Sequence, residues 1–349
     1  MTTEALTRVI RDITERYSQF GYFPSAAVRV FNRAETLATA EAGEATQTAL
    51  FDVASLTKIA TATQILQLMD EGRLALTDRL ADRFDEVRSD PWLAGRIGNV
   101  TLFQLLTHTS TIPDWFPFYT WRGEDFWLVC KAALRGHLPV SGVVYSDLNF
   151  MILGKLIEKT RGLPLDECLK LDLAGPLGIA DEFLYRPDPG REIVPSCYGD
   201  GVEIQMCADR GMPFDGWRSS GVPVVGAVND GNAHYFFNGV SGHAGVFATA
   251  RAYEKLCQLY MNTDRRLWAQ AQRTQPESPG RGLGFQTTVM YPHGCGHTGF
   301  TGTSIYFSSE YNIGVVAMTN RLFYPEPSGQ AVNDFRRCLH EAVFALSVH

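Results

Sequence analysis

The stretch Phe51–Thr61 reads FDVASLTKIAT and places a serine and a lysine three residues apart, at Ser55 and Lys58. Only six of the 31 basic residues are lysines and 25 are arginines, so a chance Ser-x-x-Lys pair is expected well under once. An arginine essentially never gives up its proton, whereas a lysine can be made neutral by burial and can then take a proton from a hydroxyl group. The pair therefore suggests a serine nucleophile with an amine beside it.

Residues 54–72 (ASLTKIATATQILQLMDEG) predict a long helix that begins near Ser55. Positions three apart lie on one face of a helix, so Lys58 can reach the Ser55 hydroxyl. A serine at a helix N-terminus also lies where the macrodipole and free backbone N–H groups favour negative charge. The alternative is that Ser55 only caps the helix and Lys58 is solvated.

The remaining pattern combines terminal helices with β-rich segments near both ends. Residues 1–23 have apolar side chains at helical spacing, which predicts an amphipathic helix, and about 328–347 read as a final helix. Residues 26–32 and 36–43 resemble the strands of a hairpin, and 296–320 alternate in two further β-rich runs. The middle, roughly 70–245, has short helical patterns broken by proline and glycine clusters.

The simplest architecture for these elements is α+β. An antiparallel sheet would be built from both chain ends and flanked by the terminal helices, with a mostly helical domain inserted from the middle. We expect a discontinuous sheet domain at 1–70 and 245–349 and a mostly helical domain at 71–244. The active site is expected in the cleft between the two domains.

Composition narrows the class of partner. A hydrophobic content of 45% with 20% charged residues is typical of a globular enzyme. The formal charge of −7 and the lack of a Lys/Arg cluster argue against nucleic acid or a membrane surface, which leaves a small-molecule ester, amide or peptide-like substrate. The N-terminus lacks a signal-peptide pattern, no run of about 18 apolar residues predicts a membrane span, and seven cysteines without a Cys-x-x-Cys pair suggest reduced thiols. We predict a cytoplasmic protein; its oligomeric state is not indicated.

Two further motifs follow the serine–lysine pair. Residues 142–158 place Tyr145, Ser146 and Asp147 before an apolar helix, and residues 294–307 place His297-Thr298-Gly299 on a strand. In this order, the three motifs resemble those of the serine β-lactamase and penicillin-binding protein superfamily. The segments 105–115, 240–250 and 281–285 resemble its class C and esterase-like branch, and the resemblance spans roughly residues 25–322. It implies a β-lactamase-like fold.

The resemblance implies roles for the motif residues. Ser55 would attack a carbonyl and become acylated, while Lys58 and Tyr145 share the proton transfers; which of these two is the base stays open. The backbone N–H groups of Ser55 and Phe300 would form the oxyanion hole. Asp147, His297, Thr298 and Gly299 are the expected substrate-binding residues.

Departures from the family pattern bear on the substrate. Asp147 stands where asparagine is common, and we expect it to pair with Lys58 and help keep that amine charged. His297 stands where most β-lactamases have a lysine, and with an ordinary pKa of about 6.5 it would be mostly neutral, which weakens the case for a substrate carboxylate. Phe300 is bulky where penicillin-recognising members usually have a small residue. These departures favour esterase, amidase or acyl-transfer chemistry over penicillin hydrolysis.

Residues 113–127 hold seven aromatic side chains, which could line an acyl pocket or belong to the core. Trp115 is the one that we predict to contact substrate. His243, close to Gly242 and Gly245, is expected to mark a turn packed behind the site, with a place at the pocket rim as the alternative. The histidines show no metal-binding motif and no phosphate loop is evident, so neither a metal nor a cofactor is expected.

The leading hypothesis is thus a serine hydrolase that cleaves a small ester or amide through an acyl-Ser55 intermediate. A β-lactamase, a D-amino-acid peptidase and an acyltransferase would share that intermediate. A different class of hypothesis is a catalytically inactive binding or regulatory homologue, which would not be acylated at Ser55.

Overall fold

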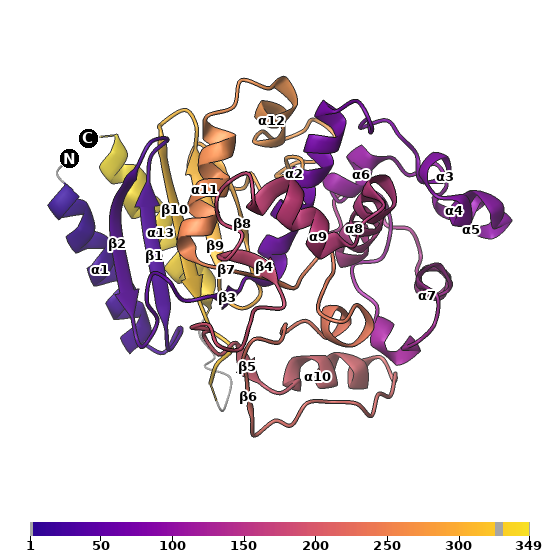
Figure 1. Ribbon diagram of the computed structural model, residues 1–349, viewed down its shortest axis with the longest axis horizontal. Helices are drawn as coiled ribbons and strands as arrows, with labels where there is room; N and C mark the ends of the chain where they lie inside the picture. Colours follow the sequence, from indigo (N-terminus) through magenta and orange to yellow (C-terminus); the bar gives the residue numbers. More distant parts are fainter. Residues whose placement is uncertain (1–2, 325–330, 349) are drawn as a thin grey trace.

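Strands from both ends of the chain form one antiparallel sheet in the computed structural model, which describes residues 3–324 and 331–348 (Figure 1). The strand order is β2-β1-β10-β9-β8, and Val28 of β1 lies opposite Ala317 of the central strand β10 on one side and Ala40 of β2 on the other. The strands are β1 (Ala26–Phe31), β2 (Thr36–Ala42), β8 (Cys295–Thr298), β9 (Ser304–Ser308) and β10 (Ile313–Thr319). The predicted antiparallel sheet is confirmed.

Helices cover both faces of this sheet (Figure 1). The terminal helices α1 (Thr3–Gln19) and α13 (Val332–Ser347) pack together on one face, where Val28 and Val30 of β1 are buried against them. Alternate residues of a strand point to opposite faces, so Ala27 and Phe31 belong to the other core, with α11 (Ala250–Met261). Both predicted terminal helices are confirmed over the described residues, and positions 1–2 and 328–330 of the predicted ranges lie outside those residues.

The middle of the chain is mostly helical, as predicted. Its helices are α3 (Leu80–Arg83), α4 (Asp85–Ser89), α5 (Pro91–Ile97), α6 (Leu102–Leu106), α7 (Phe126–Arg135), α8 (Asp147–Arg161), α9 (Leu165–Leu169) and α10 (Gly201–Asp209). A further short helix, α12 (Arg266–Ala271), follows α11 in the C-terminal part of the chain. Two small sheets, too short to predict, are β3 (Phe51–Asp52)-β7 (Val246–Ala248)-β4 (Phe183–Tyr185) and β5 (Cys197–Tyr198)-β6 (Pro223–Val224). Among the described residues, no helix combines the length and the apolar character that crossing a membrane requires.

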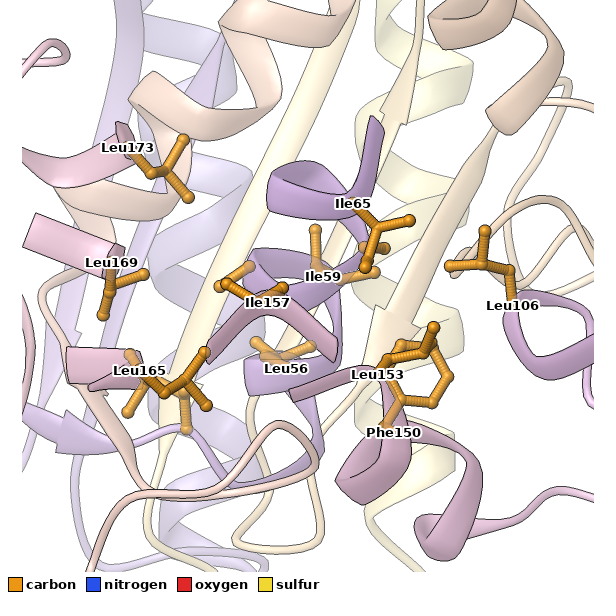
Figure 2. Packing of buried hydrophobic residues seen from close by; sticks show 14 of the residues in the cluster. Leu56, Ile59, Ile65, Leu106, Phe150, Leu153, Ile157, Leu165, Leu169 and Leu173 are labelled. Atoms are coloured by element: carbon orange, nitrogen blue, oxygen red, sulfur yellow. The ribbon is translucent and has the colours of Figure 1, made fainter. Parts of the chain in front are cut away.

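Helix α2 (Thr57–Asp70) runs through the largest hydrophobic core and is buried on nearly all sides. Figure 2 shows apolar side chains of α2 and its N-terminal turn beside those of α6, α8, α9 and the π-helical turn that follows α9 (Lys170–Ala174), and all of the labelled ones are at most 2% exposed. They are Leu56, Ile59, Ile65, Leu106, Phe150, Leu153, Ile157, Leu165, Leu169 and Leu173. A lysine on this helix is therefore surrounded by protein rather than by water.

Close backbone contact between α8 and the loop before β7 gives a stability prediction. A Cβ added to Gly242 would lie 2.1 Å from the Phe150 carbonyl oxygen and 2.9 Å from Gly154 Cα, so Gly242→Ala is expected to lower the free energy of unfolding by about 2 kcal/mol or more. Gly95→Ala, in α5 with no atom within 4 Å of the new Cβ, is the control and should raise it by up to about 1 kcal/mol. Urea unfolding measures both, and equal stability of the two variants would contradict the packing described.

Candidate active site

A strained turn carries Ser55 to the start of α2. Ala54 has a φ of 48°, in the left-handed region that favours glycine, and its N–H donates to Asp52 Oδ1 at 2.9 Å. The other oxygen of Asp52 accepts from the N–H of Asn229 at 2.6 Å. This buried carboxylate holds the turn in place, so that Ser55 lies partly exposed at the N-terminus of α2.

Lys58 is completely buried, and its amine lies at the centre of the site. Nζ donates to Ser55 Oγ and to the His243 carbonyl oxygen, both at 3.1 Å, and it lies 2.7 Å from Asp147 Oδ1. Burial alone would lower the pKa of Lys58, but the Asp147 carboxylate and the Tyr145 hydroxyl raise it above its ordinary value. The expected pairing with Asp147 is confirmed, and the amine is held as an ammonium with three acceptors.

Two cations flank the ring of Tyr145, which is partly exposed. The distance to its centroid is 5.0 Å from Lys58 Nζ and 5.2 Å from the guanidinium carbon of Arg281. The ring centroids of His108 and His297 lie 4.6 and 6.0 Å from that of Tyr145. The structure thus brings all three motifs together, and it adds Arg281, which opens the family-like segment 281–285 but was assigned no role from the sequence.

Both histidines beside this ring are neutral. Burial and nearby cations lower the pKa of His108 and of His297 well below the usual range. His297 Nδ1 donates to the Thr298 carbonyl oxygen at 2.8 Å, while His108 Nδ1 accepts from the Ser146 N–H at 3.0 Å. The Nε2 atoms of both rings and Nη1 of Arg281 are buried without a hydrogen-bond partner among the described residues. The expectation of an uncharged His297 is therefore supported.

The third motif ends in a tight turn against the Ser55 segment. Gly299 donates its N–H to the Thr303 carbonyl oxygen at 2.7 Å, and a Cβ at Gly299 would come within 2.4 Å of the Val53 carbonyl oxygen. Only glycine permits this approach. Phe300 follows with 45% of its surface exposed, and the Arg321 guanidinium carbon lies 4.8 Å from its ring centroid.

Asp230 and the loop that contains His243 form a second layer behind Lys58. His243 is 1% exposed; Nε2 lies 2.9 Å from Asp230 Oδ1, and Nδ1 lies 2.8 Å from Ser241 Oγ. Burial would raise the pKa of Asp230, but His243 and Lys58 lower it below its ordinary value. The position behind the site that was predicted for His243 is confirmed.

Within the described residues, Asp147, Asp230 and His243 form a group with metal-ligand geometry, because their ligand atoms lie within 4.8 Å of one another. Lys58 already lies against Asp147, and His243 Nε2 is paired with Asp230. The ammonium of Lys58 therefore occupies the position beside Asp147 where a metal ion would bind. Asp147, Asp230 and His243 form a hydrogen-bonded network around Lys58.

The aromatic side chains of residues 113–127 lie partly in the core and partly at the surface. Four of its side chains are at most 9% exposed, namely Phe118, Tyr119, Phe126 and Trp127. Trp115 is partly exposed, and the Arg210 guanidinium carbon lies 4.8 Å from its ring centroid. The residue before it, Asp114, accepts the N–H of Asp147 at 2.9 Å, so Trp115 adjoins the second motif.

Glu203 on α10 is expected to make the stability of the fold depend on pH. Its carboxylate accepts from the Tyr119 hydroxyl at 2.8 Å and from the Gly231 N–H at 2.9 Å, while burial and the Asp230 carboxylate raise its pKa from 4.5 to about 7. The fold thus favours the protonated acid, and the stability that it contributes is present below pH 4.5 and is lost as the pH rises to about 7.

The variant Glu203→Gln keeps groups able to make both hydrogen bonds and cannot ionise. It is therefore expected to match the wild type near pH 4 and to exceed its free energy of unfolding at pH 8 by on the order of 2 kcal/mol. Urea unfolding across this range measures the difference, with the exposed Glu41→Gln as the control. A difference that does not grow with pH would contradict the assignment.

Comparisons with known proteins agree with this geometry. The family model described as beta-lactamase matches residues 10–340. An N-acetylmuramyl-L-alanine amidase of Bacillus subtilis is 28% identical over 309 residues, which cover 79% of this chain and 69% of the relative. A putative D-alanyl-D-alanine carboxypeptidase of Salmonella paratyphi A is 27% identical over 322 residues, covering 80% and 71%.

Among solved structures, EstCE1, a hydrolase with promiscuous acyltransferase activity, has the same fold. It superimposes with a TM-score of 0.72 at 15% identity, covering 98% of this chain and 99% of EstCE1. The match extends over both the sheet and the helical middle of the chain.

Proposed function

The chain belongs to the beta-lactamase family and is a serine hydrolase of that family, and from this premise we propose that it cleaves a small ester or amide through an acyl-enzyme on Ser55. The observation that carries the proposal is the contact of the Ser55 hydroxyl with Lys58 Nζ at 3.1 Å, at the N-terminus of a buried helix. The positive charge beside Oγ and the helix N-terminus both stabilise the alkoxide as it forms.

Tyr145 is the base in this proposal. Lys58 is paired with Asp147, and each proton of its ammonium has an acceptor, so it has no lone pair to take the Ser55 proton. Tyr145 would accept that proton as its phenolate, an anion that the nearby ammonium of Lys58 and guanidinium of Arg281 would stabilise. Lys58 then acts as the fixed cation that keeps both oxygens oriented.

The proposed reaction has two steps, acylation of Ser55 and hydrolysis of the acyl-enzyme. Ser55 Oγ bonds to the substrate carbonyl carbon as its proton passes to the Tyr145 phenolate, and that proton goes on to the leaving alcohol or amine when the ester or amide bond breaks. Water then attacks the acyl-Ser55 ester and gives a proton to the same phenolate. Tyr145 returns this proton to Ser55 Oγ as the bond between Oγ and the acyl carbon breaks, and the acid is released. An alcohol or amine in place of water would make the reaction an acyl transfer.

Backbone N–H groups of Ser55 and Phe300 would hold the oxyanion. The N–H of Phe300 has no acceptor among the residues that the structure describes, and the turn that carries it is bonded to the Ser55 segment through Thr303 Oγ1 and the Val53 carbonyl oxygen at 3.1 Å. A donor without an internal acceptor next to the nucleophile is what an oxyanion hole requires.

The charges and side chains at the site favour esters and amides over penicillins. His297 is neutral, so the third motif offers no cation to a substrate carboxylate. Phe300 extends from the turn, where it restricts bulky substrates, and Trp115 is the predicted contact for an apolar acyl group. Thr298 and Gly299 would border the substrate beside this turn.

The position of Arg281 supports a second candidate function, that of a D-amino-acid peptidase. Its buried Nη1 has no partner among the described residues, and a carboxylate at the end of a peptide would provide one. The Salmonella relative named above is a putative carboxypeptidase.

A substrate panel tests the proposal. Wild type and Ser55→Ala are assayed with a short-chain p-nitrophenyl ester, an amino-acid amide, a D-alanyl-D-alanine peptide and a penicillin, with and without methanol as acyl acceptor. Turnover of the ester or amide that depends on Ser55 supports the proposal. Turnover of the peptide alone favours the peptidase, and equal turnover by Ser55→Ala would refute the acyl-enzyme.

A further inference from the structure

A buried arginine of the C-terminal helix reaches the turn of the third motif. Arg336 on α13 is 5% exposed, and its Nη2 donates to the carbonyl oxygens of Gly299 at 2.6 Å and of Thr303 at 2.9 Å. Nη1 donates to Asn333 Oδ1 at 2.8 Å, which orients the guanidinium from its own helix. Three hydrogen bonds thus hold this side chain in one orientation.

No carboxylate balances this charge among the residues that the structure describes. Burial lowers the pKa of Arg336 to about 10, with the nearby Arg321 adding to the effect, so the group is still a cation at neutral pH. Burying an unpaired cation costs folding free energy, and an apolar side chain of similar size would not carry that cost. A gain in stability therefore does not explain why Arg336 is buried at this position.

A functional role for Arg336 follows from the geometry of the peptide group that joins Gly299 to Phe300. The carbonyl of Gly299 and the N–H of Phe300 belong to the same planar unit, in which the two point in opposite directions. A guanidinium bonded to the carbonyl oxygen therefore fixes the direction of the N–H, and it draws electron density toward the oxygen, which leaves the N–H hydrogen more positive.

Other contacts hold the same turn from outside. Arg321 Nε donates to the carbonyl oxygen of Phe300 at 2.7 Å, and Thr301 Oγ1 donates to the carbonyl oxygen of Asp52 at 2.7 Å. The Thr301 bond attaches the turn to the segment that leads to Ser55, and the Arg321 bond attaches it to the residues that follow β10. Arg336 is the side chain among them that bonds to the Gly299 carbonyl.

We propose that Arg336 is a positioning residue for the oxyanion hole: its guanidinium, bonded to the Gly299 carbonyl, orients and polarises the Phe300 N–H toward the substrate oxyanion. The inference rests on the proposed function, because it assumes that Ser55 forms an acyl-enzyme. Arg336 itself touches neither the substrate nor Ser55 in this account, and it transfers no proton.

The test compares Arg336→Met and Arg336→Lys with Arg337→Met, a neighbouring arginine on α13 whose side chain is 54% exposed. Steady-state kinetics with a p-nitrophenyl ester are measured together with the infrared carbonyl stretch of the isotopically labelled acyl-Ser55. Arg336→Met is expected to lower kcat/KM by about 10- to 100-fold with little change in KM, since removing a whole oxyanion donor costs about 100- to 1,000-fold. The acyl carbonyl stretch should move to higher frequency, because a weaker hole polarises that bond less.

Arg336→Lys keeps the charge but carries its donors on one nitrogen, without the planar fork of a guanidinium, and is expected to fall between the wild type and Arg336→Met. Arg337→Met should behave as the wild type. An unchanged kcat/KM and an unchanged stretch in Arg336→Met would overturn the inference; if that variant does not fold, the same result in Arg336→Lys would do so. A wild type with no Ser55 adduct would overturn the proposed function and this inference together, whereas normal acylation with an unaffected Arg336 variant overturns the inference alone.

Discussion

Replacing Lys58 by methionine is expected to lower the rate of Ser55 acylation by on the order of 10³-fold. The substitution removes the ammonium that contacts Ser55 Oγ and leaves the Asp147 carboxylate without the cation now 2.7 Å away. Breaking a buried ion pair by removing one partner typically costs about 3 kcal/mol or more. We therefore expect a loss of stability, measured by urea unfolding, along with the loss of acylation, measured by intact-protein mass.

The double variant Lys58→Met/Asp147→Asn separates the two effects. A neutral amide at position 147 removes the unpaired charge, so most of the lost stability should return while acylation stays low. Recovery of acylation with stability would contradict a direct role for Lys58, because it would mean that the single variant was inactive only through misfolding.

Tyr145→Phe is expected to lower kcat for ester cleavage by about 10²- to 10⁴-fold with little change in KM. The reason is that the pKa of Lys58 is raised above its ordinary value, so the amine stays charged at neutral pH and cannot replace the phenol as base. Stopped-flow acylation of wild type and variant measures the loss directly.

Tyr306→Phe is the matched control for that experiment. Its hydroxyl donates to the carbonyl oxygen of Pro292 at 2.8 Å, and its side chain is buried in the core between the sheet and the terminal helices, so the variant should lose about 1 kcal/mol of stability and keep its kcat. If Tyr145→Phe acylates as fast as this control, the base is another group and the account of Tyr145 fails.

The fold was largely predictable because its sheet strands and terminal helices have strong periodic patterns. Alternation in residues 26–43 and 296–320 predicted strands that pair across the whole chain, and the structure contains them as β1, β2, β8, β9 and β10. The two- and three-residue strands of the small sheets carry too few residues for any period to be visible.

The candidate site was predictable where a side chain defines the role. Ser55, Lys58, Tyr145 and Asp147 were identified by their residue types and order, and the structure brings them together. The loop at 241–243 contributes through backbone carbonyl oxygens: Lys58 Nζ bonds to that of His243. Every residue type has a carbonyl, so no sequence pattern marks such a contact.

The arginines of the site were missed for a related reason. Arg281 and Arg336 are two of 25 arginines, and neither lies in a motif that assigns it a partner. Their roles depend on long-range placement, Arg281 over the ring of Tyr145 and Arg336 against the Gly299 carbonyl. Asp230 was missed likewise, because only the fold places it beside His243.

The most direct test of the central claim is the intact mass of the protein after incubation with a fluorophosphonate or a short-chain p-nitrophenyl ester, followed by peptide mapping. We predict one adduct per chain, located on Ser55, absent in Ser55→Ala and strongly reduced in Lys58→Met. An unlabelled wild type, or a Ser55→Ala variant that is labelled to the same extent, would contradict the acyl-Ser55 mechanism.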